Sequence, residues 1–296
     1  MNSEFGIRNS CLALAGVALA CAVAVAQDAQ RLPTEIGQTR FDTGQNIVPV
    51  YEGWIPNPDG TFDLVFGYMN RNYVEELAIP AGPNNNIEPG GPDRGQATYF
   101  LTRRRARLFR VRVPKDFGKQ ELVWTVTVNG KTEKAYASLL PVEEINEQIY
   151  ATGNNTVRDA DPNKPPSIVL PKEMIASVGA PLTLAAAVTD DGLPKPPAPA
   201  RQAVTTQNGN VVRQVNNNAV ARPRGLALTW FQLRGPAKVT FDRTGPISVA
   251  NGKADVPARF PAPGIYTLVA TANDGALSTK AEVTVTVTAA SSGRGR

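Results

Sequence analysis

Histidine is absent from this chain of 296 residues, and the two cysteines, Cys11 and Cys21, both lie close to its start. These residue types supply thiol nucleophiles, Ser-His-Asp triads and most zinc and haem ligands. The chain after Cys21 therefore excludes those kinds of chemistry, and it excludes disulfide bonds as well. Hydrolysis by two carboxylates, acid–base chemistry by lysine or tyrosine, and calcium sites built from oxygen ligands remain open.

Sustained helical patterns are also missing, which argues against an α/β enzyme fold. Glycine and proline number 25 each, and such frequent turn residues favour short strands over long helices. Hydrophobic residues make up 42% of the chain, enough apolar material for packed cores. The length predicts about two domains.

The first 26 residues predict a signal peptide. Arg8 precedes an apolar run at 11–26, CLALAGVALACAVAVA, which ends in the small-x-small pattern of a cleavage site. A lipoprotein signal acylated at Cys21 is an alternative, although Leu19 departs from the usual lipobox, and an uncleaved anchor is a third. No later run is apolar for long enough to span a bilayer. We expect a secreted bacterial protein in the periplasm, at the cell surface or outside the cell.

A first β-sandwich module is predicted over residues 46–140, after a polar lead at 27–45. Strand-like segments occur at 48–55, 61–69, 74–79, 98–113, 122–128 and 131–139, with a long loop at 80–97. Asn129-Gly130 between the last two segments predicts a hairpin with a type I′ turn. Residues 141–166 are expected to be a linker, with one or two helical turns at 141–150.

A second module is predicted over residues 167–290, followed by a tail at 291–296. Its strand-like segments are 167–171, 182–192, 226–233, 237–242, 254–260, 266–272 and 281–288. About seven short strands separated by turns are typical of an immunoglobulin-like (Ig-like) sandwich. The fold class we expect is all-β, with two antiparallel Ig-like β-sandwich modules in tandem after the signal peptide.

Residues 165–288 carry Trp230, Gly235-Pro236, Phe241, Pro263-Gly264-x-Tyr266 and Asn273-Asp274-Gly275. On these residues the second module resembles the PKD-like and related Ig-like repeats of bacterial surface proteins. It departs from the strict PKD pattern, because Phe231-Gln232-Leu233-Arg234 stands where Asp-Gly-Asp-Gly usually follows the tryptophan. The segments FGYMNRN (66–72), IPAGPNN (79–85) and GGPDRGQ (90–96) resemble an uncharacterised β-domain of exported bacterial proteins. The first resemblance implies a surface protein with an Ig-like fold, the second implies export and β-structure only, and neither implies a ligand.

An insertion at residues 193–225 separates two strands that a plain sandwich would join directly. Its charges are all positive, and they come from Lys195, Arg201, Arg213, Arg222 and Arg224. They equal the net charge of the whole chain, +5. The proline-rich start favours extended chain and the Asn/Gln-rich part favours disorder. The insertion is either an arm for an anionic surface or a solvated, mobile loop. Nucleic acid is not an expected partner, because no nucleic-acid fold motif is present.

Further arginines, Arg103, Arg105, Arg110 and Arg112, lie in one strand-like segment. They are interpreted as the wet face of a sheet, guarding an edge strand, with Glu75, Glu76, Glu121 and Glu133 as neutralising acids. A glycan or carboxylate site is the alternative, because guanidinium groups bind carboxylates bidentately.

Three tryptophans invite separate interpretations. Trp124 and Trp230 lie in alternating apolar strands and are expected in the cores. Trp54 lies beside a turn and near Tyr51, so it is either a packed strand end or a half-exposed platform for a sugar ring.

Acidic residues supply two weaker hypotheses. Asp190, Asp191 and Asp274 precede glycines, which indicates turns first, with calcium binding at the ends of the sandwich as the alternative. The carboxylates Asp59, Asp63, Glu75 and Glu76 have no spacing that marks an acid/base pair.

Together these patterns predict a non-enzymatic binding or scaffolding protein of the bacterial envelope or extracellular space. Its partner would be an envelope glycan or a surface protein contacted through loops, as in adhesion. The alternative is a structural subunit of a surface fibre or multiprotein assembly, joined through strand edges. A carboxylate-dependent glycoside hydrolase is the weakest hypothesis. The sequence predicts no obligatory cofactor, and it leaves the oligomeric state open.

Overall fold

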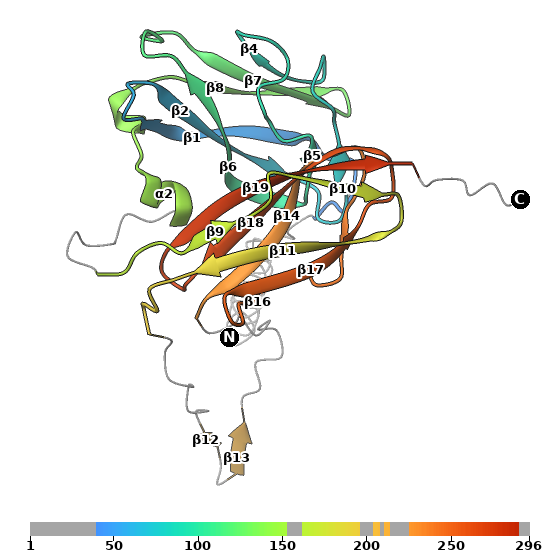
Figure 1. Cartoon of the computed structure of the whole chain (residues 1–296). Helices are drawn as coiled ribbons and strands as arrows, with labels where there is room; N and C mark the ends of the chain where they lie inside the picture. The colour runs from blue at the N-terminus through green and yellow to red at the C-terminus, as the bar shows by residue number, and fades with distance from the viewer. Residues whose placement is uncertain (1–39, 153–161, 196–203, 208–209, 214–224, 290–296) are drawn as a thin grey trace, which may run out of the picture. The chain divides into compact units, whose positions relative to one another are not determined.

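Strands dominate the computed structural model, which describes residues 40–152, 162–195, 204–207, 210–213 and 225–289 (Figure 1). The helical elements among these residues are the short turn η1 (Pro141–Glu143) and the helix α2 (Glu147–Thr152). None of the described helices has the length and apolar character needed to cross a membrane. The all-β expectation is confirmed. The predicted signal peptide and the tail at 291–296 lie outside the described residues.

The first module consists of antiparallel sheets. One has the order β1-β2-β6, from β1 (Ile47–Pro56), β2 (Phe62–Asn70) and β6 (Arg103–Val113). A second has the order β4-β7-β8, from β4 (Asn85–Glu88), β7 (Leu122–Val128) and β8 (Lys131–Ala137). The short strands β3 (Leu77–Ala78) and β5 (Tyr99–Phe100) form a pair of their own. The predicted β7–β8 hairpin is confirmed, and Asn129 and Gly130 both have positive φ, at 50° and 73°.

Aromatic side chains fill the core between the two three-stranded sheets. Phe66 of β2 stacks on Phe109 of β6 at a centroid distance of 5.4 Å, and it meets Trp124 of β7 edge-on at 5.9 Å. Trp124 is fully buried, as expected. Its indole Nε1 donates to Asn85 Oδ1 at 2.9 Å, and the amide of Asn85 donates onward to the carbonyls of Ile79 and Ala97. This network positions β4 inside a segment whose composition predicted a loop, which corrects that expectation.

The second module has the strand order of an immunoglobulin-like sandwich. Its strands are β9 (Ser167–Val169), β10 (Glu173–Ser177), β11 (Pro181–Thr189), β14 (Ala227–Arg234), β15 (Thr240–Phe241), β16 (Ile247–Ser248), β17 (Lys253–Arg259), β18 (Gly264–Asn273) and β19 (Ser278–Thr288). One sheet has the order β9-β11-β17-β15, which matches A-B-E-D, and the other contains β14-β18-β19, which matches C-F-G. Strand A of the Ig-like fold is split in two. Its first part, β9, pairs with β11 in one sheet, and its second part, β10, pairs in parallel with β19 in the other.

Two side chains mark the same fold. Trp230 on β14 is buried in the second core, where the sequence placed it. The hydroxyl of Tyr266, near the start of β18, donates to the carbonyl of Ala262 at 2.8 Å. A tyrosine that bonds back to the chain before this strand is the tyrosine corner of Ig-like domains. The Pro263-Gly264-x-Tyr266 pattern was therefore a signal of local geometry.

The insertion contains a hairpin of β12 (Val204–Gln207) and β13 (Asn210–Arg213). This differs from the extended or disordered chain that its composition favours. The reason lies in the β-branched valines and in the Asn-Gly sequence at 208–209, the strongest short-range hairpin signal. Arg213 is the last residue of β13, whereas Arg201, Arg222 and Arg224 lie outside the described residues. The arm hypothesis stays a prediction.

Residues 141–152 pack on the outer face of the sheet β1-β2-β6. The amide of Ile145 donates to the carbonyl of Trp54 at 2.8 Å, and Tyr150 of α2 packs with Ile55 and Val65 in a small apolar cluster. Gly53 permits this approach, because a Cβ built on it would lie 2.5 Å from the carbonyl oxygen of Glu143. The helical turns expected here are present, and they form part of the packed body.

The described residues from Phe41 onward belong to one compact unit, and within it the two modules share apolar packing. Leu233 and Val269, on the outer face of β14 and β18, belong to the core of the first module. The Oγ1 atom of Thr98 accepts from the amide of Gly235 at 3.1 Å, and Arg234 pairs with Asp93 at 2.6 Å. Figure 1 shows the resulting succession of sheets, with β14, β18 and β19 between β6 and the strands β11 and β17.

Candidate functional site

The arginines of β6 separate into two groups, because the acids of β1, β2 and α2 reach only some of them. In the second half of the strand, Arg112 lies opposite Asp63 of β2, and its Nε donates to the carboxylate at 2.9 Å. Arg110 lies 3.6 Å from the same carboxylate, and it donates to both carboxylate oxygens of Glu147 at 2.6 Å. These two arginines are held in ion pairs.

Asp63 is the central acceptor of this network and is 6% exposed. Burial alone raises the pKa of its carboxyl, but hydrogen bonds from Arg112 and Asn57 and the charge of Arg110 outweigh burial, so the pKa is lowered. From the sequence we expected four glutamates to neutralise the arginines of β6, and that expectation is wrong. Glu75 accepts from the amide of Gly44, Glu76 binds Lys238 and Tyr99, Glu133 accepts from Asn46, and Glu121 is exposed. The register of β2 against β6 decides which acid lies beside which arginine, and the sequence alone does not give this register.

At the other end of β6, several cations stay at the surface. Arg103 lies over the ring of Tyr73 at 3.9 Å, and Arg105 and Arg71 are exposed. Positive φ angles at Arg103 (65°) and Arg107 (51°) interrupt the regular strand here. We call the group Arg71, Tyr73, Arg103 and Arg105 the arginine surface. Arg104 beside it is paired with Glu52 at 2.5 Å.

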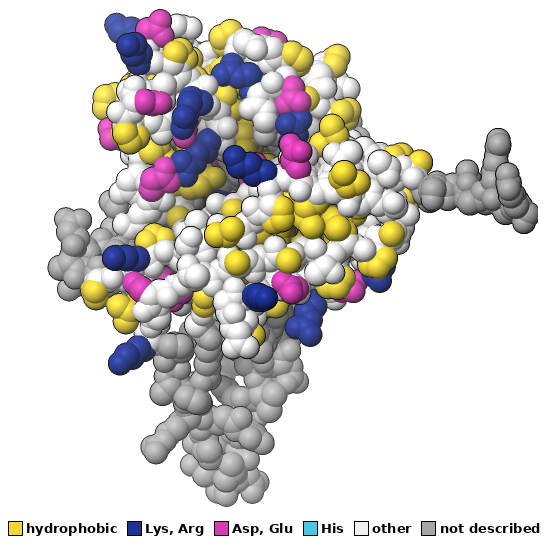
Figure 2. Space-filling view, in the orientation of Figure 1, with side chains coloured by type: hydrophobic (Ala, Val, Ile, Leu, Met, Phe, Trp, Pro, Cys, Tyr) yellow, Lys and Arg dark blue, Asp and Glu magenta, His cyan; other side chains and the backbone are white. Residues whose placement is uncertain are grey.

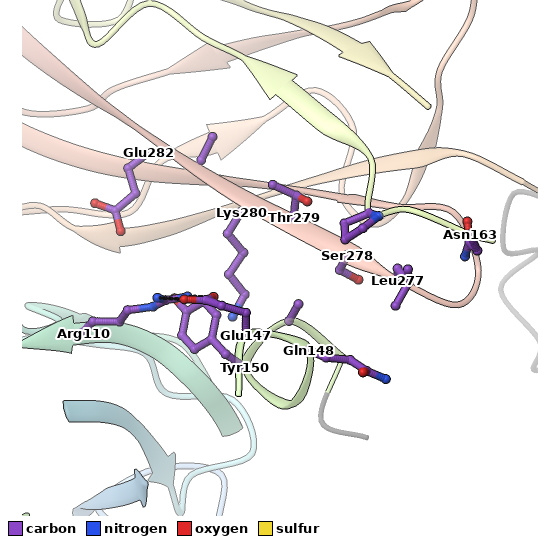
Figure 3. Close-up of a pocket in the computed structure, with 13 residues that line it drawn as sticks. Arg110, Glu147, Gln148, Tyr150, Asn163, Leu277, Ser278, Thr279, Lys280 and Glu282 are labelled. Atoms are coloured by element: carbon purple, nitrogen blue, oxygen red, sulfur yellow. Dashed lines mark hydrogen bonds and ion pairs between the residues drawn. The ribbon is translucent and has the colours of Figure 1, made fainter. Parts of the chain in front are cut away.

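A cavity of about 680 Å³ lies between β6, α2 and β19, and we call it the intermodule cavity (Figure 3). The guanidinium of Arg110 lies 3.7 Å from the centroid of the Tyr150 ring, and the Nζ of Lys280 lies 4.3 Å from it. Lys280 reaches across from the second module and donates to the carbonyl of Arg107 at 2.5 Å. Glu147 and Glu282 also line the cavity.

The charges around this cavity shift both of the titratable groups on β19. Burial and the nearby cations Arg107 and Arg110 lower the pKa of Lys280 to about 8. Burial raises the pKa of the Glu282 carboxyl. Glu147 is fixed by its bidentate contact with Arg110, so the two glutamates do not form a free carboxylate pair. Among the described residues no ion pair holds Glu282, so the arrangement offers a lysine amine and this carboxyl.

The proposed sugar platform is corrected by the position of Trp54. The side chain is 8% exposed, its Nε1 donates to the carbonyl of Leu140 at 2.9 Å, and Phe62 packs against it edge-on. Tyr51 beside it donates through its hydroxyl to the carbonyl of Ser138. Residues 138–140 cover the strand end, so Trp54 has no open ring face, and the packed alternative holds.

The three aspartates suggested for calcium form turns. Asp190 accepts from the amide of Gly192 and Asp191 from that of Leu193, both at 2.9 Å. One oxygen of Asp274 accepts from the amides of Ala276 and Leu277 at 2.6 Å. In the part of the chain that the structure describes, no group of three or more acidic, histidine or cysteine side chains is arranged to hold a metal. The turn interpretation accounts for all three residues.

Sequence reasoning did not single out Lys280, Tyr150 or Glu147. A weak signal was present in the last strand, because Lys280 and Glu282 interrupt an otherwise threonine- and valine-rich segment on the same face. Two alternate charged residues on the face opposite the buried valines indicate a polar site on that face of the strand. Tyr150 lay in the presumed linker, where no pattern pointed to it.

No model of a known protein family matches the chain, and no curated protein matches its sequence. Solved structures that align with it include the titin domains Z1Z2 in complex with telethonin, at 10% identity over 82% of this chain and 98% of that one, with a TM-score of 0.24. Fibronectin(III)-like modules of Clostridium thermocellum CbhA align at 10% identity over 85% and 98%, with a TM-score of 0.25. Domains 4 and 5 of the S-layer protein SbsC align at 13% identity over 82% and 98%, with a TM-score of 0.24.

Superpositions at this level carry no argument about function. The class assignment rests on the strand order A-B-E-D and C-F-G and on the tyrosine corner, which define the second module as an Ig-like β-sandwich. The first module is a sandwich of antiparallel sheets with its own strand order.

Proposed function

We propose that the chain is an exported, non-enzymatic binding and scaffolding protein of the bacterial envelope or extracellular space. Its partner is an acidic glycan at the cell surface, held by the arginine surface. The observation that carries the proposal is that Arg71 and Arg105 are exposed and Arg103 is half-buried, while Arg104, Arg110 and Arg112 of β6 are held in ion pairs. Guanidinium groups recognise carboxylates bidentately, and an arginine resting on an aromatic ring is already oriented for this.

The scaffold supports this role because the arginine surface lies on a packed strand. Its residues come from β6 and from the segment directly after β2, both anchored by the aromatic core of the first module. Binding then orders few side chains, which limits the entropic loss on association. The basic insertion at 193–225 is a second contact for the same anionic surface in this proposal.

Binding to an array of acidic and neutral glycans tests the proposal. We expect the chain lacking residues 1–26 to bind glycans with carboxylates or sulfates, and to bind more weakly as salt rises. The double variant Arg103→Ala/Arg105→Ala should lose about tenfold or more in affinity, in line with charge-assisted hydrogen bonds. Arg243→Ala, an exposed arginine on the second module, is the matched control and should leave binding unchanged. If the double variant binds acidic glycans as tightly as Arg243→Ala does, the proposal is wrong.

A specific surface favours the assembly alternative. β10 is an edge strand, and Ile175 and Ile265 flank Thr286 on the outer face of the sheet, 76% and 66% exposed. Figure 2 shows hydrophobic side chains gathered below the first module, over the region of β10 and β19. Concentration-dependent light scattering that Ile175→Lys abolishes, together with no glycan binding, would favour a fibre or assembly subunit. If light scattering gives the mass of a monomer at every concentration, the assembly alternative is excluded.

A further inference from the structure

The outward face of β19 gives the intermodule cavity its chemistry. Val283, Val285 and Val287 point into the core of the second module, so the alternate residues Lys280 and Glu282 face the first module. Lys280 extends toward Tyr150 and the second half of β6, as Figure 3 shows. Its amine therefore lies beside a cavity rather than in bulk water.

Charged groups from every neighbouring element surround this amine. Arg107 and Arg110 come from β6, Glu52 from β1, Glu147 and the phenol of Tyr150 from α2, and Glu282 from β19. Glu147 is paired with Arg110, and Glu52 is paired with Arg104, so neither carboxylate is dedicated to the ammonium. Two cations and burial therefore favour the neutral amine, and the pKa of Lys280 is lowered to about 8. At pH 7 the neutral fraction is about two hundredfold larger than that of a surface lysine.

We propose that Lys280 is a covalent attachment site for small polar aldehydes, including open-chain reducing sugars, which enter the intermodule cavity and form an imine with its amine. A lysine beside other cations in a desolvated pocket is the arrangement that activates an amine as a nucleophile. The cavity volume of about 680 Å³ lies within the range of small-molecule sites. Ser278 and Thr279 line it and offer hydroxyl groups to a polyhydroxylated ligand.

The chemistry balances without an oxidant or a reductant. The lone pair of the amine forms a bond to the carbonyl carbon while the carbonyl π electrons move to oxygen. One proton passes from nitrogen to that oxygen, which gives a carbinolamine. Solvent then donates a proton to the hydroxyl, the nitrogen lone pair expels it as water, and the resulting iminium returns its N–H proton to solvent. The sum is one amine and one aldehyde converted to one imine and one water.

Glu282 is a second titratable group that lines the cavity, and a water between its side chain and that of Lys280 could pass protons to and from the reacting nitrogen. Glu282 lies two residues from Lys280 on the same strand face, and the two Cα atoms are about 7 Å apart by the strand repeat. Its carboxyl has a raised pKa, so it retains a proton to a higher pH than an ordinary glutamate. The hydrogen bond from Lys280 to the carbonyl of Arg107 uses one N–H and leaves the lone pair of the neutral amine available.

Trapping with a hydride donor tests the proposal on the whole chain. The chain is incubated with glyceraldehyde and cyanoborohydride at pH 7, and the reduced adducts are located and timed by peptide mass spectrometry. We expect Lys280 to be modified at least about tenfold faster than the exposed lysines Lys131 and Lys134, on the strength of its neutral fraction. The rate at Lys280 should rise with pH to a plateau, with its midpoint at about 8.

Two variants separate reactivity from folding. Glu282→Gln should slow adduct formation at Lys280 several-fold without changing the rates at Lys131 and Lys134. Lys280→Arg keeps the charge and the donor to Arg107, and it should remove the fast adduct while the fold, read by circular dichroism, persists. Modification of Lys280 at or below the rate of Lys131 in the unaltered chain overturns the proposal. The array experiment on the arginine surface is independent of this outcome.

Discussion

Asp63 shows how a single side chain organises this protein. Its carboxylate is buried and accepts hydrogen bonds from Arg112 and Asn57, with Arg110 close by. Removing the negative charge weakens the acceptor of Arg112, whereas Arg110 keeps its contact with Glu147. We expect Asp63→Asn to lower the free energy of unfolding at pH 7 by about 1–2 kcal/mol, the usual scale for hydrogen bonds to charged groups. Urea denaturation measures this change, and Asp116→Asn, at an exposed aspartate, is the control.

The pH dependence of that loss follows from the direction of the pKa shift. The folded-state pKa of Asp63 lies below its unfolded value of about 3.9, so the carboxylate stabilises the fold fully above that value. The contribution disappears as the pH falls through the folded pKa. The difference between Asp63→Asn and the unaltered protein should therefore shrink at pH 3. An unchanged difference at pH 3 contradicts the assignment.

Gly53 supports the packing of the segment after the first module. Its φ of 120° is a region that side chains rarely adopt, and a Cβ would lie 2.5 Å from the carbonyl oxygen of Glu143. We expect Gly53→Ala to destabilise the protein by about 2–4 kcal/mol, from backbone strain and displacement of residues 141–145. Gly44→Ala is the control, because its φ is also positive, at 79°, while nothing lies within 4 Å of its Cβ. Equal losses in thermal denaturation would show that the approach to Glu143 is unimportant.

Among the strands, β18 begins at the tyrosine corner, which connects it to the preceding loop. Tyr266 is fully buried, and its hydroxyl donates to Ala262. We expect Tyr266→Phe to cost about 1 kcal/mol, because it removes one buried hydrogen bond and leaves the carbonyl unsatisfied. Tyr136→Phe, at an exposed tyrosine of β8, should change stability by less than about 0.5 kcal/mol. Chemical denaturation compares the two variants, and similar values would remove the corner from the stabilising features.

Alternation and turn residues predicted most of the strands. The segments at 61–69, 122–128 and 131–139 appear as β2, β7 and β8 within one or two residues. β4 and β10 were missed for physical reasons. The sequence of β4, Asn-Asn-Ile-Glu, is a poor strand former, and its place depends on the bond between Asn85 and Trp124. β10 gains its partner from β19, more than a hundred residues later in the chain.

The candidate site was predictable only in part, because it depends on contacts between distant segments. The arginines of β6 were recognised as a group, yet the sequence does not show that Asp63 and Glu147 take two of them. Trp54 beside its turn left a packed and a half-exposed position open, and only the structure shows that residues 138–140 cover it. Lys280 belongs to a site that exists only after two modules meet.

Across the whole unit, the shared packing predicts a coupled unfolding of the two modules. Leu233 is a second-module residue, 2% exposed, in the core of the first. We expect one calorimetric transition for the chain, and two after Leu233→Asp, because a buried charge at this contact separates the modules. Leu228→Ala, inside the second core, should lower the midpoint without dividing the transition. Two transitions in the unaltered chain would mean that the contacts are too weak to couple the modules.

The parallel pairing of β10 with β19 has a mechanical consequence. The pairs run from Glu173 with Thr284 to Ser177 with Thr288, so the two strands point the same way. A pull that draws the end of β19 away from the start of β10 acts along both strands in opposite directions. The load is then shared by all the hydrogen bonds between them at once, because no single pair can open ahead of the others. Under such a pull the β10–β19 pair is loaded in shear, and its hydrogen bonds resist together instead of breaking one after another.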